Sequence, residues 1–206
     1  MFFALQVSPA FRPFVLILLL VFGAIVALIE LRVIQYAYQR IGIDRRYVFS
    51  VLLLSLLGSY LNIPVAVLAP TDDLPATVVE VNVGGAIIPT LLSLFLFIKG
   101  RDYWRPVVAT IVVTVLVNWI AYPIPNEGIA TPIFLPPLAA AFSALILSRK
   151  SAPQIAYIAG CMGTLLGADV LNLWRVQALG SAAVSIGGAG TFDGVFLTGI
   201  IAVLLA

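Results

Sequence analysis

The sequence predicts an all-α fold, a polytopic bundle of seven transmembrane helices that forms a single domain over residues 1–206. Three observations predict it. The chain is 62% apolar and only 10% charged, whereas soluble domains are roughly 45–50% apolar and about 25% charged. The apolar residues gather in windows close to the length of about 20 residues that a spanning helix needs. The basic residues, finally, alternate between the loops that join these windows.

Seven windows are apolar enough to be spanning helices. They cover residues 14–36, 47–69, 78–98, 106–122, 133–148, 154–174 and 191–206. The last is short, because its sixteen residues reach only about 24 Å as a helix against a hydrocarbon core of roughly 30 Å. The stretch before it, residues 181–190, is apolar and rich in glycine. We expect this stretch to enter the outer part of the membrane as a broken, non-helical segment that protein or water surrounds.

Lysine and arginine residues concentrate in alternate loops. Nine of the eleven lie at the inner end of the first window or in the loops after the first, third and fifth windows, namely Arg32, Arg40, Arg45, Arg46, Lys99, Arg101, Arg105, Arg149 and Lys150. Because positive residues favour the cytoplasmic side, we expect the amino terminus outside and the carboxyl terminus inside. The start of the chain lacks the basic region and the cleavage site of a signal peptide, so the first window is expected to remain as a span.

The residue types present exclude several kinds of site. The chain has no histidine, which excludes Ser-His nucleophile pairs, HExxH zinc sites and histidine-ligated haem. Cys161 is the only cysteine, so an intrachain disulfide and a multi-cysteine metal site are excluded as well. We therefore expect no metal and no cofactor, and the net charge of +2 gives no indication of nucleic acid. Carboxylates remain as candidates for acid–base chemistry within the membrane.

Two aspartates are predicted to lie at nearly the same depth. Asp169 is fifteen residues, and Asp193 thirteen residues, from the inner end of its window, which gives about 22 Å and about 20 Å. Their windows are consecutive and antiparallel, and short connections usually make such spans neighbours. Two close carboxylates cannot both ionise easily, so one holds a proton while the other can activate water. Asp169 and Asp193 are therefore the candidate catalytic pair.

Other polar or permissive residues are predicted at the same level. The candidate substrate- or ion-binding residues are Gly188, Gly190, Asn172, Asn62, Asn82, Asn118 and Glu80. The dipeptide Pro136-Pro137 predicts a helix break in the fifth span at this depth. Gly160, Gly163 and Gly167 are three and four residues apart and predict one face for close helix packing. This polar layer, beneath a water-accessible outer face, is typical of a site.

Two resemblances follow from these segments. Asp169 and Asp193, on the last two spans with glycines before them, resemble the aspartate pair of GxGD-type intramembrane aspartyl proteases, the presenilin and signal-peptide-peptidase group; here Thr191 and Phe192 separate Gly190 from Asp193. This resemblance implies an aspartic-type hydrolase. The stretch from Gly167 to Leu173 and the stretch from Gly187 to Gly199 are also similar to a family of uncharacterised prokaryotic polytopic membrane proteins. That resemblance implies a prokaryotic plasma membrane and brings no activity.

Each candidate residue also has an alternative interpretation in which it only stabilises the fold. Asp193 could lie in the first turn of the last helix with Thr191 as the N-cap, where the helix dipole stabilises a carboxylate. Asp169 could pair with Arg175 near the interface. Glu80, two residues inside its window, could face interfacial water. The asparagines could be interhelical hydrogen-bond links worth roughly 1 kcal/mol each.

Two functions of different class therefore remain open, with a packing scaffold as a third. The first is an intramembrane aspartyl hydrolase that cleaves a peptide and uses the Asp169/Asp193 pair. The second is a proton- or cation-coupled transporter of a small solute that uses the same polar layer, since carboxylates beside a broken helix also bind ions in carriers. In both, the lipid bilayer is the surrounding partner, and we lean towards the enzyme because no intramembrane cation is predicted to neutralise the two acids.

Overall fold

The computed structural model describes residues 12–70, 76–124, 128–178, 181–188 and 194–206. The chain divides into two units, residues 1–36 and residues 37–206. The first unit holds most of α1 (Arg12–Arg40), a continuous helix of 29 residues. Its apolar side chains from residue 16 to residue 30 are exposed, which suits a helix surrounded by lipid.

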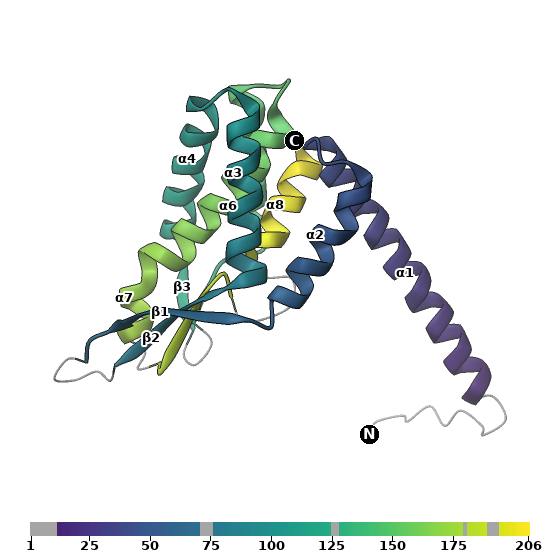
Figure 1. Cartoon of the computed structure of the whole chain (residues 1–206), viewed down its shortest axis with the longest axis horizontal. Helices are drawn as coiled ribbons and strands as arrows, with labels where there is room; N and C mark the ends of the chain where they lie inside the picture. Colours follow the sequence, from purple (N-terminus) through teal and green to yellow (C-terminus); the bar gives the residue numbers. More distant parts are fainter. Residues whose placement is uncertain (1–11, 71–75, 125–127, 179–180, 189–193) are drawn as a thin grey trace, which may run out of the picture. The chain divides into compact units, whose positions relative to one another are not determined.

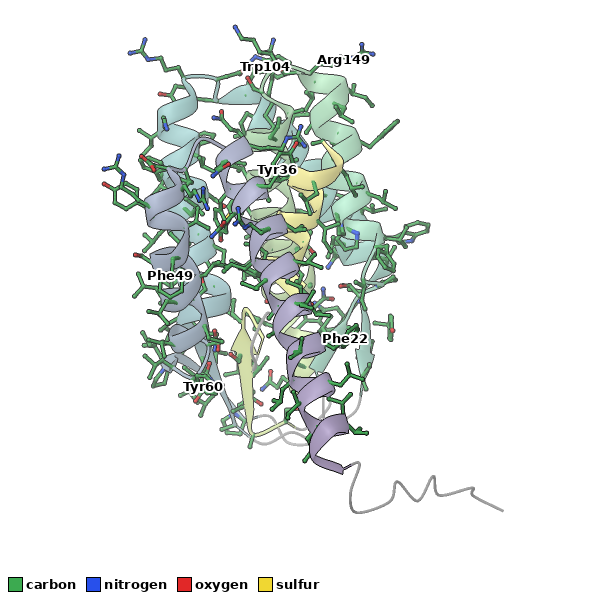
Figure 2. The ribbon with its side chains drawn as sticks, turned by 90° about the vertical axis from the view of Figure 1, so that its right-hand side faces the viewer. Phe22, Tyr36, Phe49, Tyr60, Trp104 and Arg149 are labelled. Carbon is green, nitrogen blue, oxygen red and sulfur yellow. The ribbon has the colours of Figure 1, made fainter. Side chains whose placement is uncertain are left out.

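The second unit is a bundle of helices with a small sheet at one end (Figure 1). Its longer helices are α2 (Arg45–Gly58), α3 (Ile88–Gly100), α4 (Trp104–Ile120), α5 (Leu135–Leu147), α6 (Ala152–Thr164) and α8 (Gly194–Leu205). Helix α6 lies at the centre, in contact with α3, α4, α5 and α8. The helices run alternately between the sheet end and the opposite end, where Trp104 and Arg149 lie (Figures 1 and 2).

Glycines allow α6 to pack closely against two neighbours. A Cβ at Gly160 would lie 3.2 Å from the Thr198 carbonyl oxygen of α8, whereas a Cβ at Gly163 would lie 2.6 Å from Val113 of α4. Gly167, one turn further, also faces α4. The predicted close packing is therefore present, but it is divided between α8 and α4 and does not form one face.

The sheet has three strands in the order β1-β2-β5. Strand β1 (Asn62–Leu68) is antiparallel to β2 (Thr77–Asn82), and β5 (Ala183–Ile186) is parallel to β2. The β-branched residues of β2 favour this conformation. A short hairpin of β3 (Tyr122–Ile124) and β4 (Gly128–Ala130) follows α4. The prediction of an all-α fold is therefore wrong in this respect, although the chain is mostly helical.

The second predicted window, residues 47–69, is a helix only in its first half. Helix α2 ends at Gly58, and the rest of the window is β1. Pro64 lacks an N–H and belongs on an edge strand, which is where β1 lies. The third window likewise begins as β2, and its helix starts only after Asn82, with a π-helical turn η1 (Val83–Ile87) that leads into α3. The hydropathy pattern alone does not distinguish a short apolar strand from a segment of helix.

The prolines of the fifth window do not break a helix. Pro136 and Pro137 lie in the first turn of α5, where a missing N–H costs nothing and the fixed φ favours helix formation. The predicted broken segment before the last helix is non-helical where the structure describes it, because β5 is followed by Gly187 and Gly188 at positive φ. Its membrane depth stays a prediction.

Within the part of the chain that the structure describes, three helical stretches are long and apolar enough to cross a membrane, namely Val15–Arg40, Val83–Gly100 and Ala152–Gln177. The third combines α6 with a π-helical turn η2 (Leu165–Asp169), a 3₁₀ turn η3 (Val170–Asn172) and α7 (Leu173–Ala178). Helices α4, α5 and α8 are apolar but shorter. The structure is thus compatible with an integral membrane protein.

Candidate functional site

Asp169 lies where the central helix stops being a regular α-helix. It is the last residue of η2, and the 3₁₀ turn η3 follows directly. The backbone N–H of Gly187 donates a hydrogen bond of 2.7 Å to Asp169 Oδ2. Single π-helical turns inside helices are frequent at functional sites because they re-aim side chains. The carboxylate is thereby held against the end of β5.

Gly187 is required at this contact for two reasons. Its φ of +84° is a conformation that L-residues with a Cβ rarely adopt. A Cβ there would also lie 2.6 Å from the backbone nitrogen of Ala86. The end of β5 is therefore in close contact with the first turn of η1, and glycine brings the chain near enough for its amide to reach Asp169.

Asn82 joins four elements at the same end of the bundle. Its Nδ2 donates to Asn62 Oδ1 and to the Ser59 carbonyl oxygen, both at 2.8 Å. Its Oδ1 accepts from the Gly85 N–H at 2.8 Å, which makes Asn82 the N-cap of η1. Ser185 Oγ of β5 completes the cluster with a donation of 3.1 Å to Asn62 Oδ1. Asn82 is fully buried.

The other two predicted asparagines meet at one carbonyl group. Asn172 Nδ2 donates to the Gly167 oxygen at 2.6 Å, and Asn118 Nδ2 approaches the same oxygen at 3.4 Å. The change from α to π and 3₁₀ geometry disturbs the regular backbone ladder, so side-chain donors can complete it. Asn172 is fully buried, and its Oδ1 has no hydrogen-bond partner within the part of the chain that the structure describes.

The remaining predicted residues are Glu80, Gly188, Gly190 and Asp193, and the structure describes the first two. Glu80 lies half-buried in the middle of β2, opposite Pro64 of β1 and Ser185 of β5; its predicted place inside a helical span is therefore wrong. Gly188 has a φ of +72°, and its carbonyl oxygen accepts a hydrogen bond of 2.9 Å from Ser185 Oγ. Gly190 and Asp193 lie outside the described residues, so their predicted roles stay predictions.

Arg175 makes a contact other than the predicted pairing with Asp169. Its Nη1 donates to the Ala121 carbonyl oxygen at 3.4 Å, and its guanidinium lies 5.2 Å from the centre of the Trp174 ring. The ion pairs recorded within the described ranges are Asp44–Arg46 and Asp102–Arg105, both in loops or at helix starts. Across those same ranges, no three Asp, Glu, Cys or His residues gather as a metal site would require.

The sequence analysis did not identify Ser59 and Ser185, which bond to Asn82 and Asn62, or Gly187, which donates to Asp169. The sequence did indicate where the helix that includes η1 and α3 begins, because asparagine is a preferred N-cap residue and Asn82 stands directly before it. Gly187 could not be distinguished from its neighbours, since the sequence does not show which glycine of the run has a positive φ. The structure brings Asn62, Asn82 and Ser185 into one hydrogen-bonded group and Asn118 and Asn172 into another, with Asp169 bound to the end of β5.

The sequence model of one protein family matches residues 25–205, and its description is "Protein of unknown function (DUF1614)". The chain belongs to the DUF1614 family. The DUF1614 match contains every predicted site residue, from Asn62 to Asp193. The predicted relation to an uncharacterised family is therefore confirmed, whereas nothing in the comparisons supports the resemblance to intramembrane aspartyl proteases. Searches of curated proteins and of solved structures find no match for this DUF1614 protein.

Proposed function

We propose that this DUF1614 protein is a seven-pass integral protein of a prokaryotic plasma membrane, with its amino terminus outside and its carboxyl terminus inside. Three helical stretches have the length and apolar character of spans. The alternation of α2 to α8 between two ends supports the remaining passes (Figure 1). The turns after α3 and α5 hold Lys99, Arg101, Arg105, Arg149 and Lys150 at the end opposite the sheet, which suits a cytoplasmic side.

We further propose that Asp169 is a catalytic carboxylate of an intramembrane hydrolase. The hydrogen bond from Gly187 to Asp169 carries this proposal, because it brings a carboxylate against the end of an extended strand. The four predicted asparagines donate their amide hydrogens to protein oxygens or accept from protein donors. They hold the backbone together and carry no titratable group, whereas Asp169 carries a carboxylate, the kind of group that acid–base chemistry needs.

The second carboxylate of the proposed pair is Asp193. It directly precedes Gly194, the first residue of α8, and α8 packs against α6, the helix that leads to Asp169. In the reaction, the ionised aspartate takes a proton from water as the oxygen attacks a peptide carbonyl carbon. The protonated partner polarises the carbonyl and then gives its proton to the leaving nitrogen, so that the C–N bond breaks and the two acids exchange roles.

The sheet suggests how an extended peptide would reach Asp169. Among the described strands, β5 pairs only with β2, so its outer edge has backbone groups to which a peptide could add as a further strand. Such a peptide would run beside Ala183–Ile186 and arrive at Gly187 next to the carboxylate. A polypeptide in extended conformation is therefore the substrate class that this geometry favours.

The carrier stays as the second candidate on one specific observation. Two π-helical turns lie near Gly187, since a Cβ there would touch Ala86 of η1 and its N–H donates to Asp169, the last residue of η2. Discontinuous helices at an acidic residue also bind coupling ions in transporters. Asn172 Oδ1, which accepts no hydrogen bond from the described residues, is an oxygen that could contribute to such a site.

The test uses the full-length protein in proteoliposomes with quenched fluorogenic transmembrane peptides. We expect cleavage by the wild type and a loss of about 10²–10⁴-fold in rate for Asp169→Asn and Asp193→Asn, the range for removal of a general acid or base. Asp44→Asn is the matched control, because Asp44 is an N-cap in an exposed loop and asparagine caps equally well. Uptake of a solute driven by a proton or sodium gradient, without cleavage, would establish the carrier instead.

A separate measurement tests the geometry without knowledge of the substrate. In a Cys161→Ala background, Asp169→Cys and Asp193→Cys together should form a disulfide under mild oxidation, since a disulfide needs Cβ atoms about 3.5–4.5 Å apart. Asp169→Cys with Asp102→Cys is the control that should stay reduced, because Asp102 lies beyond the other end of α3. Failure of the first pair to cross-link would refute the proposed aspartate pair.

A further inference from the structure

A cavity of about 400 Å³ lies among α3, α4, α6 and the first residues of η2, and Asp169 is not among the residues that line it. Its walls are formed by Thr90, Ser93, Leu94, Phe97, Pro106, Val107, Thr110, Ile111, Ile158, Met162 and Leu166. The volume is within the range of about 300–1,000 Å³ that small-molecule sites have. Leu94, Val107 and Ile111 on its rim are about half exposed, so the cavity is a groove that opens at the surface of the bundle. In the proposed membrane placement, that surface faces lipid.

The groove continues into a small polar cleft at the end of the bundle opposite the sheet. Pro106 and Ile158 line both spaces. The cleft adds Asp102, Ser151 and Gln154 from the turn after α3 and from the start of α6. An apolar groove that ends in a polar cleft matches the two parts of a lipid molecule, an acyl chain and a headgroup.

The turn that closes this end of the groove is positively charged. It holds Lys99, Arg101 and Arg105 against one carboxylate, Asp102. Arg105 pairs with Asp102 at 2.6 Å, and Lys99 Nζ donates to the Gly42 carbonyl oxygen at 3.1 Å. Arg101 is exposed, and no hydrogen bond or ion pair is recorded for it within the described residues. Among the described residues, Arg101 is thus an exposed cation with neither a hydrogen bond nor an ion pair, and its chain neighbours Gly100 and Asp102 line the polar cleft.

We propose that this groove is a binding site for an anionic phospholipid of the inner leaflet. One acyl chain lies between α3 and α4, and the phosphate contacts the basic turn, chiefly Arg101. Exposed Trp104 in the same turn lies at the level where tryptophan meets headgroups, at the end that Figure 2 shows beside Arg149. Basic pockets between helices on the cytoplasmic side bind such headgroups because each basic side chain attracts the anionic lipid. The site depends on the proposed orientation but not on the hydrolase.

Native mass spectrometry of the full-length protein, titrated with phosphatidylglycerol or phosphatidylcholine bearing 16- and 18-carbon chains, tests the proposal. We expect phosphatidylglycerol to bind more tightly. Arg101→Asn should weaken that binding about fivefold and leave phosphatidylcholine unchanged; asparagine suits the φ of +54° at this position. Arg149→Asn, at the same end but outside the groove, is the matched control and should change neither affinity.

A second pair of variants tests the acyl chain. Val107→Trp fills the groove and should weaken the binding of both lipids, whereas Val108→Trp, its exposed neighbour outside the groove, should not. Ile111→Trp repeats the test one turn further if Val107→Trp fails to fold. Equal loss from Arg149→Asn, no effect of either groove variant, competition by inorganic phosphate alone, or a dimer that Val107→Trp dissociates would each overturn the proposal. Asp169→Asn should leave lipid binding unchanged, which separates this site from the proposed hydrolase.

Discussion

Replacement of Asn82 by alanine should be among the most destabilising single changes at the sheet end of the bundle. The side chain is fully buried and takes part in three hydrogen bonds of 2.8 Å, two as donor and one as acceptor. These bonds connect the end of α2 to β1 and cap the first turn of η1. Alanine removes all three and leaves the Ser59 carbonyl oxygen and the Gly85 N–H without these partners in a buried position.

The magnitude follows from these contacts. Loss of an N-cap costs about 1 kcal/mol, within a range of about 0.5–2 kcal/mol. Each lost interhelical hydrogen bond in a membrane protein costs roughly 0.6 kcal/mol on average. The buried Ser59 oxygen and the Gly85 N–H would then lack these partners, which adds a desolvation penalty of about 1–3 kcal/mol for a group that stays unsatisfied. We therefore expect Asn82→Ala to lower the free energy of unfolding by about 3–5 kcal/mol.

Asn82→Asp separates the two roles of the side chain. Aspartate keeps the acceptor for Gly85 N–H but replaces the donor with an oxygen that faces the Ser59 and Asn62 oxygens. We expect it to be as destabilising as alanine at neutral pH. Asn118→Ala is the control, since its single bond of 3.4 Å is long and its loss should cost less than about 1 kcal/mol.

The assay is reversible unfolding of the full-length protein in mixed micelles, followed by circular dichroism. A loss of less than about 1 kcal/mol for Asn82→Ala would refute the reasoning, because it would mean that the amide adds nothing beyond what the denatured state in the micelle recovers. An equal loss for Asn118→Ala would refute it too, since the effect would then come from any buried asparagine.

Three further results are expected. Gly167→Ala should lower the free energy of unfolding by about 1–3 kcal/mol, because its Cβ would lie 2.6 Å from a carbonyl oxygen of α4. Gly23→Ala, inside α1 with no atom within 4 Å, should not lower it in the same unfolding assay, because alanine favours the helix. Gly187→Ala should remove the contact with Asp169 through backbone strain and a clash with η1, and thermal unfolding together with the proposed cleavage assay should show both losses. The pKa of Asp44 is held below its ordinary value by the backbone N–H and then the side chain of Arg46. The cap should therefore persist as pH falls past the ordinary aspartate pKa and be lost only below it, which a carbon-13 titration of the carboxyl group measures; an ordinary midpoint would contradict it.

The sequence predicts the helical segments better than their ends. The apolar windows depend on composition alone, and α5 and α8 fall within theirs, whereas α3, α4 and α6 each extend two residues beyond one end of theirs. The sheet could not be predicted in this way. An apolar run such as that from Tyr60 to Ala69 has the hydropathy of a span, and its conformation is decided by pairing with a strand that lies elsewhere in the sequence.

For the candidate site, too, the sequence predicts the position of residues along the chain but not the contacts among them. Depth along each predicted helix placed Asp169 and the asparagines in one layer of the outer half of the membrane, and that depth stays a prediction. The depth estimate could not show which groups bond to one another. It assumes a straight α-helix, whereas the strands and the π-helical turns change the rise per residue and the direction of the chain. Asn82 illustrates this: predicted inside a helix, it is the last residue of β2 and caps the helix that follows.

The sheet also limits where Asp169 can lie relative to the bilayer. Within the described residues, the outer edges of β1 and β5 pair with no further strand, and unpaired backbone groups cost several kcal/mol each in hydrocarbon. Yet Ile63, Val65 and Val67 of β1 are exposed, which disfavours bulk water. Both facts are satisfied when the sheet lies at the membrane interface, with water at its edges and lipid against its apolar side chains. Asp169, bound to the end of β5, would then lie close to water, so hydrolysis would require no channel across the bilayer.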